Sequence, residues 1–240
     1  MVMKSRFILT LCLLAVFSFS SFAQTRQDKV RISCDEIDYP MVLKGDVAKI
    51  SMMGYEWGYE AEFDEDGCIT NLESYDGMYS ASCIYYYDSN GLLEYRTSCD
   101  YEDGELTEED KKVYLFNEEY NLVRTNVYVD GNIVYYTTYT YDARGNRIKS
   151  ESHSYENGST VITQYTYDDK CNLVKTVSSG VVSTYSYDAN NRLVKCTWQD
   201  SIAKYTCIYN YDTKGNIIGE MVYENDELSY QTVYEITYRN

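Results

Sequence analysis

The sequence predicts an all-β fold, an antiparallel β-meander of about 14 to 16 short strands that form one extended or curved sheet. Two kinds of turn alternate along the chain. In the segments that precede one of these two kinds of turn, aromatic residues alternate with polar residues. The 240 residues contain a single Pro, and Pro would remove a donor from a strand ladder. No segment shows sustained helical periodicity, so helices are not expected.

Residues 1–23 are predicted to be a secretory signal peptide. Two basic residues precede a short apolar run, and Ala23 before Gln24 fits cleavage after a small residue. The run is too short for a spanning helix, so no membrane span is expected after cleavage. A lipid anchor at Cys12 is not expected, because a small residue does not precede it. The mature protein is therefore predicted to be periplasmic or extracellular.

Residues 24–58 lack the repeat that follows and are predicted to form an N-terminal capping segment. Residues 59–240 are predicted to form one repeat domain. Its longest interruption, the acidic stretch 100–112, is interpreted as an extended loop.

The repeat is an aromatic residue and Asp, with Gly three positions after the Asp. Seven copies, some degenerate, begin 24, 29, 25, 26, 20 and 24 residues apart, which indicates a repeat array. Asp can accept backbone N–H groups at the turn, and Gly tolerates the positive φ of a bulged hairpin. The predicted turn residues are Asp64, Gly67, Asp88, Gly91, Asp142, Gly145, Asp168, Asp188, Asp212 and Gly215.

A second, tighter turn lies between consecutive copies, as at Asp76-Gly77 and Asp130-Gly131, and gives two strands per repeat. The strand before each repeat turn alternates aromatic and polar residues. Such rings could form a core, or a surface that binds the apolar faces of sugars. The candidate aromatic surface comprises Tyr139, Tyr141, Tyr165, Tyr167, Tyr185, Tyr187, Tyr209 and Tyr211.

These residues resemble the YD repeat, also called the RHS repeat, with the best matches at 141–148, 167–174 and 211–218. The resemblance covers about residues 59–238. It implies strands of a long sheet, which in large family members spirals into a shell around a toxin. The chain is most similar to small exported members, without an RHS core or toxin domain.

Composition excludes several functions. The net charge is −17, and removing Lys4 and Arg6 with the signal leaves 19 basic against 38 acidic residues, or −19. Nucleic acid is therefore not expected as a partner, because its binding depends on Lys and Arg. His153 is the only histidine, and most nucleophile–base mechanisms would require it.

Cofactors are not expected, although Asp64 to Asp66 and Asp100 to Glu105 could offer oxygen ligands to calcium. Cys196 and Cys207 form a candidate disulfide, since a loop spanning Asp200 to Ala203 would place them directly opposite. A two-residue turn would instead pair Cys196 with Tyr205.

The sequence thus predicts an exported, non-enzymatic β-repeat protein that acts as a structural or binding surface for a glycan or protein ligand. One alternative is an acidic inhibitor or immunity-type protein for a basic toxin. A second is a carbohydrate-active enzyme that uses paired carboxylates. An outer-membrane barrel is a further alternative, but the predicted strands carry charges on both faces and lack a continuous apolar band.

Overall fold

The structure is a computed structural model that describes residues 34–37, 39–40, 42–54 and 57–239. A short helical turn begins at Cys34. Sixteen strands follow: β1 (Val47–Met53), β2 (Trp57–Phe63), β3 (Ile69–Asp76), β4 (Tyr79–Tyr87), β5 (Leu93–Glu102), β6 (Glu105–Phe116), β7 (Leu122–Val129), β8 (Asn132–Tyr141), β9 (Arg147–Ser154), β10 (Thr160–Tyr167), β11 (Leu173–Ser178), β12 (Val181–Tyr187), β13 (Leu193–Gln199), β14 (Lys204–Tyr211), β15 (Ile217–Glu224) and β16 (Glu227–Tyr238).

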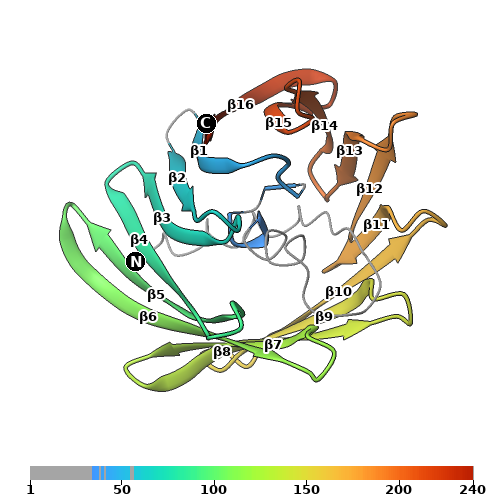
Figure 1. Cartoon of the computed structure of the whole chain (residues 1–240). Coiled ribbons are helices and arrows are strands. Elements are labelled where there is room, and N and C mark those ends of the chain that lie inside the picture. The colour runs from blue at the N-terminus through green and yellow to red at the C-terminus, as the bar shows by residue number, and fades with distance from the viewer. Residues whose placement is uncertain (1–33, 38, 41, 55–56, 240) are drawn as a thin grey trace.

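The strands form a closed antiparallel barrel (Figure 1). Each strand pairs with its neighbours in sequence, and β16 returns to β1, where Ile50 lies opposite Ile236. The predicted extended or curved sheet is therefore wrong, because its first and last strands pair and leave no edge. The spiral sheet that the RHS resemblance implied is wrong for the same reason.

The expected loop at 100–112 is also wrong. β5 extends to Glu102 and β6 begins at Glu105, so the acidic stretch is a long hairpin around Asp103 and Gly104. Both strands are longer than most others, which accounts for the 29-residue spacing without a loop.

The seven repeat turns lie at one end of the barrel, called the motif end here. In the first, the Asp64 carboxylate accepts the N–H groups of Asp66 and Cys68, each at 2.9 Å, and Gly67 has φ +79°. The same carboxylate bonds recur at Asp88, Asp142, Asp168, Asp188 and Asp212. Each turn ends in a register shift, as between Glu62 and Phe63.

The inward faces of the strands divide the barrel into two parts. On β13–β16 and β1–β4, called the apolar half, most buried inward residues are hydrophobic, including Ile50, Ala61, Cys207 and Val222. On β5–β12, called the polar half, the buried inward residues include Thr, Ser and Arg, which are described below.

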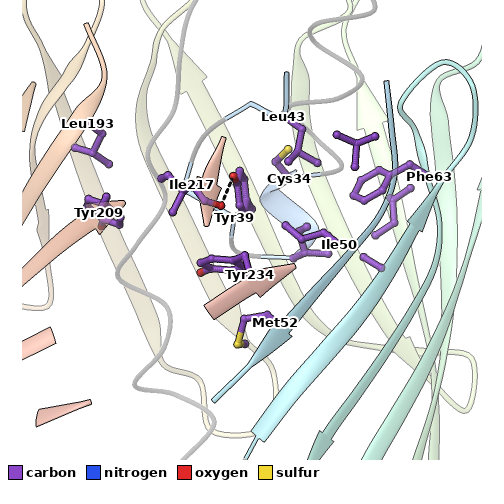
Figure 2. Packing of buried hydrophobic residues seen from close by; sticks show 14 of the residues in the cluster. Cys34, Tyr39, Leu43, Ile50, Met52, Phe63, Leu193, Tyr209, Ile217 and Tyr234 are labelled. Carbon is purple, nitrogen blue, oxygen red and sulfur yellow. Dashed lines mark hydrogen bonds between the residues drawn. The ribbon is translucent and has the colours of Figure 1, made fainter. Parts of the chain in front are cut away.

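The described residues between 34 and 46, which are 34–37, 39–40 and 42–46, are called the N-terminal segment here, and the ring of strands encloses them (Figure 1). Cys34, Ile37, Tyr39 and Leu43 are buried and pack against the apolar half (Figure 2). The predicted capping segment 24–58 thus includes a strand of the barrel, β1, preceded by chain inside the barrel. The predicted signal peptide lies outside the described residues.

Candidate functional site in the barrel interior

Hydroxyl side chains line the inward face of the polar half. Thr125, Thr137, Ser150, Thr176 and Ser183 are each at most 8% exposed. Strand register places Thr125 opposite Thr137, and Thr176 opposite Ser183. Directly opposite residues share one face of a sheet, so the hydroxyls form rows along the interior.

Tyrosine hydroxyls join these rows from one repeat to the next. The Tyr165 hydroxyl lies 3.1 Å from Ser150 Oγ, and that of Tyr185 lies 3.4 Å from Thr176 Oγ1. Tyr139 approaches Thr125 Oγ1 at 3.5 Å. The polar half therefore contains small hydroxyl residues and Tyr hydroxyl groups in alternation.

The repeat-motif tyrosines make a second ladder at the motif end. Tyr141, Tyr167, Tyr187 and Tyr211 donate to the backbone carbonyls of Leu122, Arg147, Leu173 and Leu193 in the preceding repeats. Tyr39 of the N-terminal segment donates to Ile217 O at 2.8 Å in the same way. Each hydroxyl thus fastens its repeat to the one before it.

The eight tyrosines of the candidate aromatic surface point into the barrel. Seven belong to the two ladders, 139, 141, 165, 167, 185, 187 and 211, and Tyr209 is buried in the core. They do not form an outer surface, because the sheet closes with its aromatic face inward. A ligand could reach them only from the interior.

Three cations face the interior of the polar half, one buried and two partly buried. Arg96 on β5 and Lys112 on β6 lie directly opposite each other, and both contact the Glu36 carboxylate of the N-terminal segment. Lys112 Nζ lies 2.8 Å from Glu36 Oε1, and Arg96 Nε lies 3.6 Å from Oε2. Arg96 also pairs with Asp110 at 3.1 Å.

The third cation is Arg147, which is only 5% exposed. Its guanidinium carbon lies 5.2 Å from the ring centroids of both Tyr139 and Tyr165. Its Nη2 lies 3.8 Å from Asp35 Oδ2, beyond hydrogen-bonding distance.

Burial and charge act in opposite directions on Glu36. Burial alone would raise its pKa, but the Lys112 and Arg96 charges outweigh burial and hold the pKa below its usual value. The Glu36 charge in turn raises the pKa of Lys112 against the effect of burial. Glu36 and Lys112 are therefore both ionised inside the barrel.

The sequence analysis assigned no role to Arg147, Arg96, Lys112, Asp35 or Glu36. Arg96 and Lys112 lie near an acidic stretch that was interpreted as a loop. The alternation of Lys112 with Tyr114 was the one signal that both residues share a strand face.

Cys196 and Cys207 lie directly opposite on β13 and β14, and both are fully buried. The connecting loop spans Asp200 to Ala203. The backbone N–H of Asp200 donates to the carbonyl of Ala203 at 3.1 Å. Burial raises the pKa of the Cys207 thiol. The register thus permits a bridge, and the disulfide itself stays a prediction.

The remaining candidate chemistry is sparse. Among the described residues, no group of three or more His, Cys, Asp or Glu side chains is arranged to hold a metal ion. His153 lies on β9, where its Nδ1 is 3.0 Å from Thr160 Oγ1. No described helix is long and apolar enough to cross a membrane.

The outside of the barrel carries exposed apolar side chains, such as Ile84, Ile162 and Val182, together with polar ones. One outward row runs across β1–β6 and another across β10–β15: Ser51, Glu60, Glu73, Ser82, Cys99 and Glu109, then Thr166, Lys175, Thr184, Thr197, Thr206 and Tyr223. Glu60, Glu73, Glu109 and Lys175 are exposed. Both faces of the sheet therefore carry polar residues.

No family model matches the chain, and no curated protein matches it. Among solved structures, it is similar to a porin-like protein from Bacteroides vulgatus, with 17% identity and a TM-score of 0.40 over 80% of this chain and 98% of that one. A porin-like protein from Bacteroides uniformis has 11% identity and a TM-score of 0.38, over 81% of this chain and 99% of that one. Such distant likeness assigns neither family nor activity.

Proposed function

We propose that this protein is an exported, non-enzymatic barrel that binds a carbohydrate in the polar half of its interior. The observation that carries the proposal is the set of inward hydroxyls on β7–β12, from Thr125 to Ser183. A sugar ring presents several hydroxyl groups, each both donor and acceptor, and Ser, Thr and Tyr hydroxyls match that chemistry.

The inward residues of the two halves support this choice. The apolar half is packed against the N-terminal segment, whereas the polar half presents buried Ser and Thr hydroxyls beside tyrosine hydroxyls. Tyr139 and Tyr165 add ring faces beside them, which suit the apolar faces of sugars. These side chains support a proposal in which the glycan ligand expected from the sequence binds inside the barrel rather than on an open sheet.

The barrel is proposed to be surrounded by water in the periplasm or outside the cell. A barrel that spans a membrane needs an apolar outer band about 25 Å tall. Here Glu60, Glu73 and Lys175 occupy outward positions within the strands. Burying such charges in lipid would cost about 2–4 kcal/mol for a Lys at mid-depth.

A panel of neutral and acidic oligosaccharides, measured by calorimetry, tests the proposal. Thr137→Val with Ser150→Ala should weaken binding about tenfold or more, because buried hydroxyls lose their hydrogen bonds to the ligand. Thr197→Val is the matched control, since its Oγ1 bonds to Thr184 at 2.6 Å on the outside. The absence of binding to any panel member, or an equal loss from the control, would contradict the proposal.

Incubation of the same sugars with the protein distinguishes binding from hydrolysis. The proposal expects intact oligosaccharide by mass spectrometry. Shortened products that disappear with a single Asp or Glu substitution would instead support the carboxylate enzyme considered above.

A second candidate function is inhibition of a basic protein. The outward row on β2–β6 places Glu60 directly opposite Glu73, a repulsion that the ion pair of Lys49 with Glu60 offsets only in part. A basic partner would relieve this repulsion. Capture of such a partner should then be lost at high salt and in Glu60→Gln with Glu73→Gln.

A further inference from the structure

We propose that Arg96, Lys112 and Arg147 form a carboxylate-binding subsite, which the chain's own Asp35 and Glu36 occupy in this structure. The inferred ligand is therefore an acidic sugar that carries a carboxylate beside its hydroxyl groups. This inference rests on the proposed carbohydrate function.

The cations need an anion between them. Arg96 and Lys112 are directly opposite inward residues on paired strands, and two like charges in this position destabilise a sheet. Their side chains are only 17% and 23% exposed, so water screens the repulsion weakly. The Glu36 carboxylate lies between them and compensates both charges.

Arg147 stands where the repeat otherwise places an apolar residue. The equivalent residues Leu173, Leu193 and Ile217 are fully buried at the motif end. An aliphatic side chain would therefore satisfy the fold at this position, and a buried Arg is costly to desolvate. The charge consequently has a role other than packing.

The donors at this site exceed the acceptors that the N-terminal segment provides. Arg147 Nε and Nη2 are buried and have no hydrogen-bond partner among the described residues, and the same is true of the Tyr85 hydroxyl. Asp35 approaches Nη2 only to 3.8 Å. A carboxylate that moved about 1 Å closer could form the paired bonds that guanidinium groups favour.

A uronic acid matches this donor set. Its carboxylate would pair with Arg147, whose guanidinium lies against the rings of Tyr139 and Tyr165, and its hydroxyls would meet the row at Ser150. The ligand carboxylate would compete with the Asp35 and Glu36 carboxylates, because all three would bind the same cations. Removing the internal carboxylates should therefore strengthen binding of an acidic sugar and leave binding of a neutral one unchanged.

The experiment compares tetragalacturonate with its fully methyl-esterified form by calorimetry on the signal-free protein. Tetragalacturonate should bind at least about tenfold more tightly, in line with a charge-assisted hydrogen bond. Arg147→Leu should abolish this preference and retain the neutral affinity. Asp35→Asn with Glu36→Gln should raise the acidic affinity severalfold. Arg144→Gln, at an exposed turn, is the control that should leave both affinities unchanged.

The outcomes separate the two proposals. Arg147→Leu restores the residue type of the other repeats, so loss of folding is not expected, and thermal unfolding checks it. Equal binding of the acidic and esterified sugars by the wild type, or an unchanged preference in Arg147→Leu, overturns the carboxylate subsite and leaves carbohydrate binding standing. No binding of either sugar, to wild type or to the Asp35/Glu36 variant, overturns both.

Discussion

The apolar and polar halves of the barrel are built from the same repeat but carry different inward side chains. Position for position, Cys196 and Cys207 on β13 and β14 replace the Thr and Ser that precede them on β11 and β12. The apolar half is packed against Ile37, Tyr39 and Leu43 of the N-terminal segment. The difference shows that the turns and ladders define the barrel, whereas the inward residues decide what each half can hold.

The largest expected effect is on packing. Ile50→Ala should cost about 3–4 kcal/mol of unfolding free energy, because Ile50 is fully buried against the N-terminal segment. Thr176→Ala, on the polar half, should cost about 1 kcal/mol. Urea unfolding measures both, and equal costs would mean that the two halves are packed alike.

The titration of Glu220 reports on how apolar its surroundings in the apolar half are. Burial raises its pKa to about 7, although the Tyr234 hydroxyl donates to Oε1 at 3.0 Å. The Glu220 carboxyl loses its proton near pH 4.5 in the unfolded chain and near pH 7 in the folded chain. The protonated carboxyl therefore contributes to folding stability fully below pH 4.5, and this contribution is lost as the pH rises through 7.

Glu220→Gln should remove this loss and be more stable than wild type by about 2 kcal/mol at pH 8, with little difference at pH 4. Urea unfolding at several pH values gives the comparison. Parallel profiles for the two proteins would show that Glu220 is not in an apolar environment.

Asn216 and Asn172 occupy equivalent turn positions in the two halves, and their side chains bond to different partners. The Asn216 amide accepts from Lys44 N at 2.7 Å and donates to Lys44 O at 2.8 Å. The Asn172 amide instead bonds to Asn191 of the next repeat. Of these two asparagines, only Asn216 therefore bonds to the N-terminal segment.

Asn216→Ala should destabilise the protein by about 1–2 kcal/mol and expose Cys34 to thiol reagents. Burial raises the pKa of the Cys34 thiol to about 12, so its labelling at pH 8 requires release of the segment. Mass spectrometry locates the label. Equally fast Cys34 labelling in Asn172→Ala would show that the attachment is not specific to the apolar half.

The smallest effect concerns one turn. Cys171 has φ +64° at the position that Gly145 and Gly215 occupy in other repeats, with φ +81° and +85°. Cys171→Gly should stabilise the protein by about 0.5–1 kcal/mol, whereas Cys171→Ala should not, because only Gly adopts this φ without strain. Thermal unfolding distinguishes them, and equal melting temperatures would contradict the prediction.

The sequence predicted local structure better than global form. The Asp and Gly positions of the repeat turns and the alternating aromatics are local signals, and they placed the hairpins in order along the chain. Closure depends on Ile50 meeting Ile236, a contact between the two ends that no spacing encodes. The pairing of Glu36 with Arg96 and Lys112 was likewise unpredictable, because it joins residues that become neighbours only when the sheet curls around them.

The hydrogen bond of Tyr39 fixes the contact between the N-terminal segment and β15, but it does not fix the number of strands in the barrel. The Tyr39 hydroxyl takes the carbonyl of Ile217, where a further repeat would have supplied its own tyrosine. A duplication of one repeat within β7–β12 would leave that contact and the β16–β1 seam unchanged. The ring would then grow from 16 to 18 strands and widen by about one eighth. Evolution could thus enlarge the barrel in steps of two strands without redesigning its closure.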